Sequence, residues 1–285
     1  MPTDLQRIKA QAEAMQEAEF DFAQYFEQFD KKAYSFFQKE LAKYPQENGR
    51  LNSDYDYTDS FARLDAYMLS FLINEDVLNY VNGGIKDFDN LRKENINLHN
   101  EINGLGLSKN QSDYVLNLQS QVIQYNLTTE SAIRSWFINP FKAALSTAVE
   151  TGASVSTMER FLQAWYKKEK QSGILSGVNS IPNFSQYAGQ LARDAVFKTN
   201  NAVNDSVRAV FGAEKFRYVG SLVRDSRPFC RHLIKLDRLI AYEEVPKIAS
   251  QYPQGLMKPF TIDTFSHNCG GYNCRHQQFP IISKI

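Results

Sequence analysis

Cysteine and histidine are rare in this chain, and most of them gather near the C-terminal end of the sequence. The 285 residues include three cysteines and four histidines. All the cysteines and three of the histidines fall in two stretches, SRPFCRH (Ser226 to His232) and HNCGGYNCRH (His267 to His276). Thiolate sulfur and imidazole nitrogen are ligands that zinc prefers, and the same groups act as nucleophiles and proton carriers. The clustering indicates a metal site, a catalytic site or the tight core of a small β-rich module.

The spacing within these stretches is compatible with a metal site, although the C-x2-C turn of a zinc knuckle is absent. Cys230 and His232 are separated by one residue, and so are Cys274 and His276. On extended chain, residues two apart point to the same face, so each pair could offer two ligands to one ion. A structural zinc ion bound by these four residues is the preferred metal hypothesis. A zinc-stabilised DNA-binding protein is one function that such a site would serve.

The two stretches are expected to lie side by side in one module. The 34 residues that separate them, 233–266, are enough for a strand, a helix and a second strand. Cys269 and His267 are then available as substitute ligands. The alternative is a metal-free cluster of buried thiols and hydrogen-bonded imidazoles, because cysteine is often buried as a small apolar side chain.

Four arginines flank the cysteines: Arg224, Arg227, Arg231 and Arg275. The guanidinium group binds phosphate or carboxylate in a bidentate manner, so these residues are candidates for contact with phosphate or with a partner. A nuclease or nucleotide-transfer site would place them beside His232 or His276 as acid and base. They could instead pair with Asp225, Asp237 and backbone carbonyls inside the module. Because no oxyanion loop or orienting residue accompanies the histidines, the sequence predicts no enzyme.

The charge is unevenly distributed along the chain. Lys+Arg and Asp+Glu both number 32, but residues 215–285 carry 11 basic and 5 acidic residues. A basic C-terminal part suggests phosphate or an acidic protein face as its neighbour, and the acidic remainder of the chain could also be that neighbour. Three cysteines argue against a disulfide-stapled secreted protein. No apolar run approaches the roughly 20 residues that a membrane helix needs.

The first ~45 residues predict one long amphipathic helix by their periodicity. Apolar residues recur at steps of seven, at Ile8, Met15, Phe22, Phe29 and Phe36. A companion seam of apolar residues is interrupted by Glu19. Such a stripe packs against other helices of the same chain, or it forms an arm that grips a partner subunit.

The fold class is predicted as mainly α, with an extended helical N-terminal part and a small α+β module at the C-terminus. Residues 1–180 form the helical domain and residues 181–285 the module. A helix is expected over about 61–81, with its end at Asn82–Gly84, and a polar helix is expected over 87–104. A linker over 171–185, a helix over 186–211 and a strand over 215–223 should follow.

Two sequence segments of the module resemble a known family. The segments are YVGSLVRDSRPFCRHL and GGYNCRHQQFPI, and the helix QLARDAVFKTNNAVN precedes them. They are similar to the C-terminal part of phage head-morphogenesis proteins related to phage Mu protein F. The residues that fit the outline of that family are Asp225, Arg227, Pro228 and Cys230 in the first segment, and Asn273, Cys274, Arg275, His276 and Pro280 in the second. The likeness covers roughly residues 188–281.

The resemblance implies a minor capsid protein, a structural protein present in few copies at the portal vertex of a virion. Its partners would be the portal protein, other head or neck proteins and packaged DNA, with no membrane involved during assembly. It would act in head assembly or in DNA ejection, in the head interior or neck, after assembly in the host cytoplasm. Related modules are also fused to toxin domains, so a toxin-like activity is an alternative. The GGYNCRH turn departs from the Pro–His–Cys cluster of many relatives, which weakens the transfer of a metal-binding role.

Overall fold

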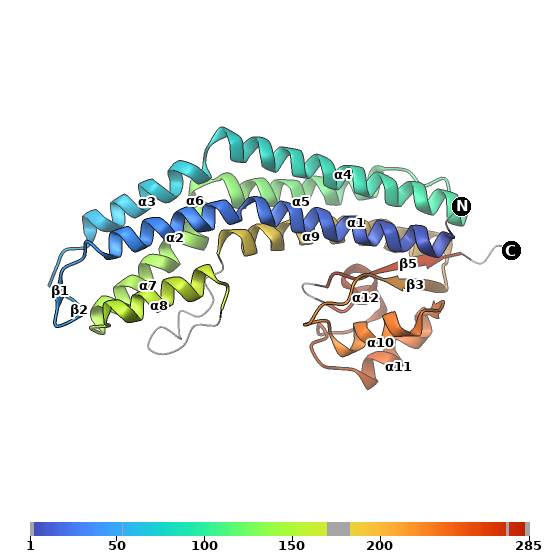
Figure 1. Ribbon diagram of the computed structural model, residues 1–285. Coiled ribbons are helices and arrows are strands. Elements are labelled where there is room, and N and C mark those ends of the chain that lie inside the picture. The colour runs from blue at the N-terminus through green and yellow to red at the C-terminus, as the bar shows by residue number, and fades with distance from the viewer. Residues whose placement is uncertain (1–2, 53, 170–182, 272–273, 283–285) are drawn as a thin grey trace. The chain divides into compact units, whose positions relative to one another are not determined.

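The computed structural model describes residues 3–52, 54–169, 183–271 and 274–282, and the fold is mainly α, as predicted (Figure 1). The chain forms two compact units. The first unit comprises residues 1–20, 84–121 and 190–285, and the second comprises 21–83 and 122–189. The expected boundary between residues 180 and 181, and most of the expected linker over 171–185, lie outside the described residues.

Four long helices contribute residues to both units: α1 (Asp4–Tyr25), α4 (Glu75–Asn103), α5 (Asn110–Thr128) and α9 (Phe184–Phe211). The other elements of the second unit are α2 (Glu27–Leu41), β1 (Gln46–Glu47), β2 (Arg50–Leu51), α3 (Thr58–Leu72), α6 (Glu130–Ile133), the π-helical turn η1 (Arg134–Ile138), α7 (Asn139–Glu150) and α8 (Val155–Tyr166). Among the described helices, none combines the length and the apolar character that a bilayer crossing requires.

The predicted N-terminal helix is divided in two, which corrects the single helix expected over the first ~45 residues. The break falls at Phe26, whose backbone N–H bonds the carbonyl of Ala23 at 3.1 Å, three residues back rather than four. The Phe26 ring is fully buried and meets the rings of Phe22 and Phe184 edge-on. The tighter helical turn at Phe26 therefore coincides with aromatic packing around its ring. The apolar periodicity of the sequence does not reveal this turn.

The seam of apolar residues packs within the chain. Ile8, Met15, Phe22 and Phe29 are each at most 4% exposed. Phe36 stacks on Tyr67, with 3.9 Å between the ring centroids. This packing confirms the intramolecular alternative, and the four buried side chains could not contact a partner without local unfolding.

The predicted helix end at Asn82–Gly84 is wrong. Helix α4 continues through this segment, and the chain breaks earlier, between Leu72 and Glu75. The side chain of Asn74 accepts a hydrogen bond from the backbone N–H of Val77 at 2.9 Å, as an N-cap does. Val77 and Val81 are completely buried, so packing outweighs the helix-breaking tendency of the glycine pair.

The C-terminal module of the first unit is α+β. Its elements are β3 (Lys215–Val219), α10 (Pro228–Leu236), β4 (Ile240–Ala241), the 3₁₀ turn η3 (Tyr242–Glu244), α11 (Val245–Gln251), α12 (Ile262–Asn268) and β5 (Gln277–Ile281). The strands form an antiparallel sheet in the order β4-β3-β5. Figure 1 shows α10, α11 and α12 gathered beside this sheet, where Phe216, Phe229 and Phe265 form a buried core.

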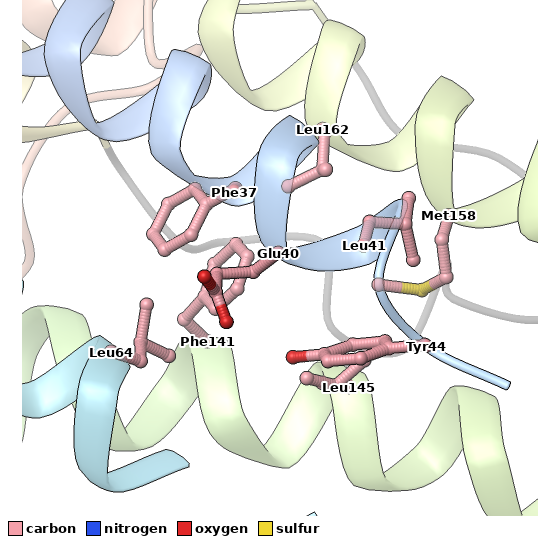
Figure 2. A pocket seen from close by; sticks show the side chains of 9 residues that line it. All are labelled: Phe37, Glu40, Leu41, Tyr44, Leu64, Phe141, Leu145, Met158 and Leu162. Atoms are coloured by element: carbon pink, nitrogen blue, oxygen red, sulfur yellow. The ribbon is translucent and has the colours of Figure 1, made fainter. Parts of the chain in front are cut away.

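A small cavity lies in the second unit. It has a volume of about 20 Å³, room for about one water molecule. Figure 2 shows its lining: Phe37, Glu40, Leu41, Tyr44, Leu64, Phe141, Leu145, Met158 and Leu162. The Glu40 carboxylate is paired with Lys43 and with Arg63. The cavity is a packing defect beside a satisfied ion pair and offers no room for an organic ligand.

A buried histidine ties the last strand to the helices of the first unit. His99 Nε2 lies 2.7 Å from Asn204 Oδ1, and Asn103 Nδ2 lies 3.1 Å from His99 Nδ1. The same Asn103 amide donates to the carbonyl of Pro280 at 3.1 Å. The His99 ring also stacks on Phe279, at 3.9 Å between centroids. Burial lowers the pKa of His99 to about 4, so the imidazole stays neutral, with Nδ1 as acceptor and Nε2–H as donor.

This histidine makes stability depend on pH. Its folded pKa lies below the unfolded value of about 6.5, so its contribution is complete above that pH and decreases as pH falls towards 4. Between pH 7.5 and 5 the free energy of unfolding should fall by about 2 kcal/mol from this group alone. Urea unfolding at the two pH values, for the wild type and His99→Gln, measures the difference.

The His99→Gln variant is needed for comparison because Asp30 titrates over an overlapping pH range. Its effect on the free energy of unfolding has the opposite sign. Burial raises the pKa of Asp30 to about 6, although the backbone N–H groups of Phe184 and Ser185 donate to its carboxylate. Its contribution is greatest at low pH and is lost as pH rises through 6. The wild type and His99→Gln should thus differ in how steeply the free energy of unfolding changes with pH. Equal slopes would contradict the role given to His99.

Candidate metal centre

Cys230 is placed in the core of the module by helix α10. Pro228 occupies the first turn, where its missing N–H costs no hydrogen bond, and Asp237 ends the helix in a left-handed conformation. Phe229, Cys230 and Leu233 form the buried face. The SRPFCRH stretch is therefore helical from Pro228 onwards, and the expectation of extended chain around Cys230 is wrong.

Cys274 and His276 are placed by the approach to strand β5. Helix α12 ends at Asn268, and Cys269 follows with a positive φ of 49°. Tyr272 and Asn273 lie outside the described residues. From Cys274 the chain runs without helix into β5, which pairs with β3 from Val219↔Gln277 to Lys215↔Ile281. Here the i, i+2 reasoning holds, since Cys274 Sγ lies 3.4 Å from His276 Nδ1.

The two stretches meet, as expected. Cys230 Sγ lies 3.8 Å from Cys274 Sγ. Within the described chain, Cys230, Cys274 and His276 form a group whose ligand atoms all lie within 4.8 Å of one another. The Tyr218 hydroxyl donates to Cys230 Sγ at 3.3 Å and lies 3.8 Å from Cys274 Sγ. The group is enclosed, since Cys230 and His276 are 1% and 3% exposed.

Two glycines allow this close packing. A Cβ on Gly270 would lie 2.5 Å from Cys230 Sγ and 3.5 Å from Cys274 Sγ. A Cβ on Gly220, whose φ is +134°, would lie 2.8 Å from the carbonyl oxygen of Arg275 and 3.0 Å from His276. The sulfurs and the imidazole thus occupy space that side chains at these positions would fill.

The electrostatics single out one anionic sulfur. The hydrogen bond from Cys230 and the contact with His276 lower the pKa of Cys274 well below the usual range, against the effect of burial. That hydrogen bond and burial raise the pKa of Cys230, and burial raises the pKa of Cys269. The backbone N–H of Gly270 also points at Cys274 Sγ, at 3.4 Å. A sulfur whose thiolate form is favoured by surrounding donors suits a bound cation.

His232 does not join this group. Residues two apart on a helix point about 200° apart, so His232 leaves the face that carries Cys230. Its ring stacks on Tyr252 instead, with 4.6 Å between the centroids. The four-residue ligand set of the sequence hypothesis is therefore reduced to three, and the error lies in reading a helix as extended chain.

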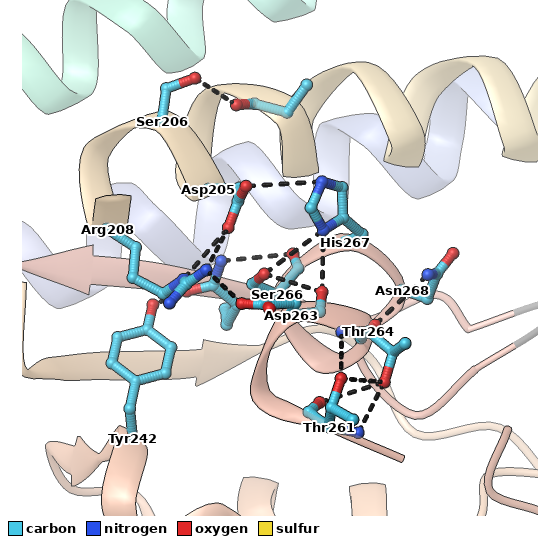
Figure 3. A network of polar contacts seen from close by, with 12 residues as sticks. Asp205, Ser206, Arg208, Tyr242, Thr261, Asp263, Thr264, Ser266, His267 and Asn268 are labelled. Carbon is cyan, nitrogen blue, oxygen red and sulfur yellow. Dashed lines mark hydrogen bonds and ion pairs between the residues drawn. The ribbon is translucent and has the colours of Figure 1, made fainter. Parts of the chain in front are cut away.

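His267 forms a separate polar site on helix α12 (Figure 3). Its Nδ1 lies 2.8 Å from the carbonyl oxygen of Asp263, and its Nε2 lies 3.4 Å from Asp205 Oδ2. Arg208 pairs with both Asp205 and Asp263. With its side chain 55% exposed, His267 serves this surface network and not the cysteine group.

The arginines have different environments. Arg227 donates to the carbonyl of Gly255 at 2.5 Å, and Arg231 donates to the carbonyls of Val223, Arg224 and Ser226. Arg224 is exposed. The backbone contacts match the alternative in which the arginines brace the module, and contact with phosphate stays a prediction.

Arg275 reaches a residue that sequence reasoning did not single out as functional. Its guanidinium pairs with Glu19 at 2.9 Å, and Arg193 pairs with the same carboxylate at 2.6 Å. Glu19 is 4% exposed. The signal was present in the sequence, because Glu19 interrupts an otherwise apolar seam. Tyr218 gave no such signal, since an aromatic residue in a strand is ordinary.

Comparison of the chain with known protein families, with curated proteins and with solved structures finds no match.

The variant Gly270→Ala tests the packing of the cysteine group. Its methyl group would overlap Cys230 Sγ, so we expect the free energy of unfolding to fall by about 1–3 kcal/mol. The control is Gly83→Ala in α4, where a Cβ meets nothing within 4 Å and alanine should stabilise the helix by about 0.5–1 kcal/mol. Denaturant unfolding gives both values, and a neutral Gly270→Ala would refute the close packing.

The variant Glu19→Gln tests the buried ion pairs. It leaves Arg193 and Arg275 facing a neutral amide, and a cost of about 3 kcal/mol is expected, as when one partner of a buried pair is removed. Glu17→Gln is the matched control, because Glu17 is exposed on the same helix. Thermal and urea unfolding compare the two, and similar small effects would mean that the pairs contribute little.

Proposed function

We propose that the chain is a structural protein of a tailed-phage virion, associated with the portal vertex and acting in head assembly or genome delivery. The observation that carries the proposal is the meeting of the two segments that resemble head-morphogenesis proteins related to phage Mu protein F. They are distant in sequence, yet Cys230 and Cys274 from the two segments lie 3.8 Å apart. Residues that form a family motif and also form one core are consistent with a shared module.

The burial of the motif favours a structural role over catalysis. The residues that could carry chemistry, Cys230, Cys274 and His276, are inside the module. A substrate would have to open the core to reach them. Arg275, the remaining charged residue of the second segment, is used by Glu19. The motif therefore builds the module, and its partners contact other residues.

The surface of the module offers basic groups to an acidic partner. Arg224, Lys235, Lys247 and Lys258 are exposed. Together with the basic excess of residues 215–285, they support a neighbour that carries negative charge. In the proposed setting that neighbour is an acidic face of the portal or neck proteins, or the packaged DNA.

Quantitative mass spectrometry of purified particles tests the proposal. The chain should be present in a few copies per particle, far fewer than the major capsid protein measured in the same sample. Chemical cross-linking of intact particles should join its lysines to the portal protein. Complete absence of the chain from purified virions would overturn the proposal.

Nucleic-acid cleavage tests the competing enzymatic class. The purified full chain is incubated with RNA and DNA beside the variants His276→Ala and His232→Ala. No cleavage above the buffer blank is expected. Cleavage that either substitution abolishes, in a variant that keeps the wild-type circular dichroism spectrum, would favour a nuclease or toxin-like enzyme instead.

A further inference from the structure

The geometry of the cysteine group matches a zinc tetrahedron. With Zn–S bonds of about 2.3 Å and Zn–N bonds of about 2.05 Å, a tetrahedral site has S–S edges of about 3.8 Å and S–N edges of about 3.6 Å. The distance from Cys230 Sγ to Cys274 Sγ is 3.8 Å, and that from Cys274 Sγ to His276 Nδ1 is 3.4 Å. A disulfide would require the sulfurs to approach to about 2.05 Å. Two of the three separations are thus close to those that a shared ion imposes, and the third, between Cys230 Sγ and the His276 ring nitrogen, is within 4.8 Å.

Cys269 is the candidate for a fourth ligand, although its Sγ is not among the ligand atoms that lie within 4.8 Å of one another. It is 1% exposed and belongs to the same buried core as Tyr218, Cys230 and Cys274. Cys269 and Cys274 have the C-x4-C spacing, with Gly270 and Gly271 between them. A shift of Cys269 Sγ towards Cys230, Cys274 and His276 would complete the four ligands that structural zinc takes.

The surroundings suit a charged metal–thiolate group. The backbone N–H of Gly270 donates to Cys274 Sγ at 3.4 Å, and the Tyr218 hydroxyl donates to Cys230 Sγ at 3.3 Å. Such donors stabilise thiolate charge and orient the ligands. The His276 ring stacks on Tyr218, at 5.5 Å between centroids, and Gly220 lies so close that a Cβ there would be 3.0 Å from the ring carbon Cδ2.

We propose that the module binds one structural Zn²⁺ ion through Cys230, Cys269, Cys274 and His276. Binding releases to solvent the protons of the thiols that are still protonated, and the four ligands close the coordination sphere. The ion then links helix α10, the end of helix α12 and the residues that lead into β5. The sheet alone connects these segments only loosely. The inference rests on the module itself and stands whether or not the chain belongs to a virion.

Metal analysis of the full chain is the first test. The protein is purified without chelator from cells grown with zinc, and the zinc content is measured by elemental analysis and native mass spectrometry. We expect about one equivalent per chain, and removal by a chelator should lower the melting temperature. Less than about a tenth of an equivalent, together with no uptake when zinc is added to the reduced protein, would overturn the proposal.

Cobalt substitution identifies the ligands without relying on any variant. Co²⁺ in the site should give a tetrahedral spectrum and a thiolate charge-transfer band whose intensity corresponds to three sulfurs. X-ray absorption of the zinc form should likewise fit three sulfurs and one nitrogen. An intensity for two sulfurs would remove Cys269 from the set. A Cys230–Cys274 disulfide in the protein as purified would overturn the metal site.

Variants then separate the ligands from their neighbours. Cys274→Ser and Cys269→Ser should each lower zinc affinity by at least about tenfold, and Tyr218→Phe should leave the zinc content unchanged. His232→Ala is the matched control for His276→Ala, because both are histidines of the same module and His232 stacks on Tyr252. Loss of zinc in Tyr218→Phe with retention in Cys269→Ser would assign the fourth position to the phenol and refute the proposed set.

Discussion

The antiparallel pairing of β3 with β5 is the constraint on which the C-terminal module depends. It joins residues 215–219 to residues 277–281, so everything between them is held as a closed excursion. Closing so long a loop is entropically unfavourable, and the sheet alone, with β4 only two residues long, offers few hydrogen bonds to offset it. Additional links between the ends of the excursion are therefore worth more here than in a large sheet.

The structure supplies such links on both sides of β5. On the core side the cysteine group connects α10 to the chain that enters the strand. Just before the strand, Arg275 is fixed by the buried Glu19 of α1. Near the end of the strand, Asn103, which also contacts His99, donates to the carbonyl of Pro280. Each link uses polar groups that are expensive to bury unless paired, so each strongly disfavours arrangements in which the partner is misplaced.

The sequence predicted the composition of this module better than its geometry. The mainly α class, the strand from Lys215 and the meeting of the two cysteine stretches follow from pattern and spacing. The error at His232 has a physical cause, since a Cys–x–His pair is compatible with either helix or strand. Pro228, a residue that is common in the first turn of a helix, is the local signal that favours a helix around Cys230. It is stronger evidence than the Cys–x–His spacing, which had suggested extended chain. The helix through Asn82–Gly84 could not be read locally, because burial of Val77 and Val81 decides it.

Helix α9 shows why polar residues can specify the place of the module. Thr199, Asn200, Asn201 and Asn204 are all at most 4% exposed, an unusual face for a helix. Asn201 donates to the carbonyl of His267 at 2.8 Å, and Asn204 accepts from His99. A second polar atom on each of Asn200, Asn201 and Asn204 is buried with no hydrogen-bond partner among the described residues. An apolar face would bury more favourably, but leucines tolerate many registers, whereas these amides can make the hydrogen bonds described above in only one. The hydrogen bonds of Asn201 to His267 and of Asn204 with His99 thus specify the register of α9 against α12 and α4, at the cost of the polar atoms that stay without a partner.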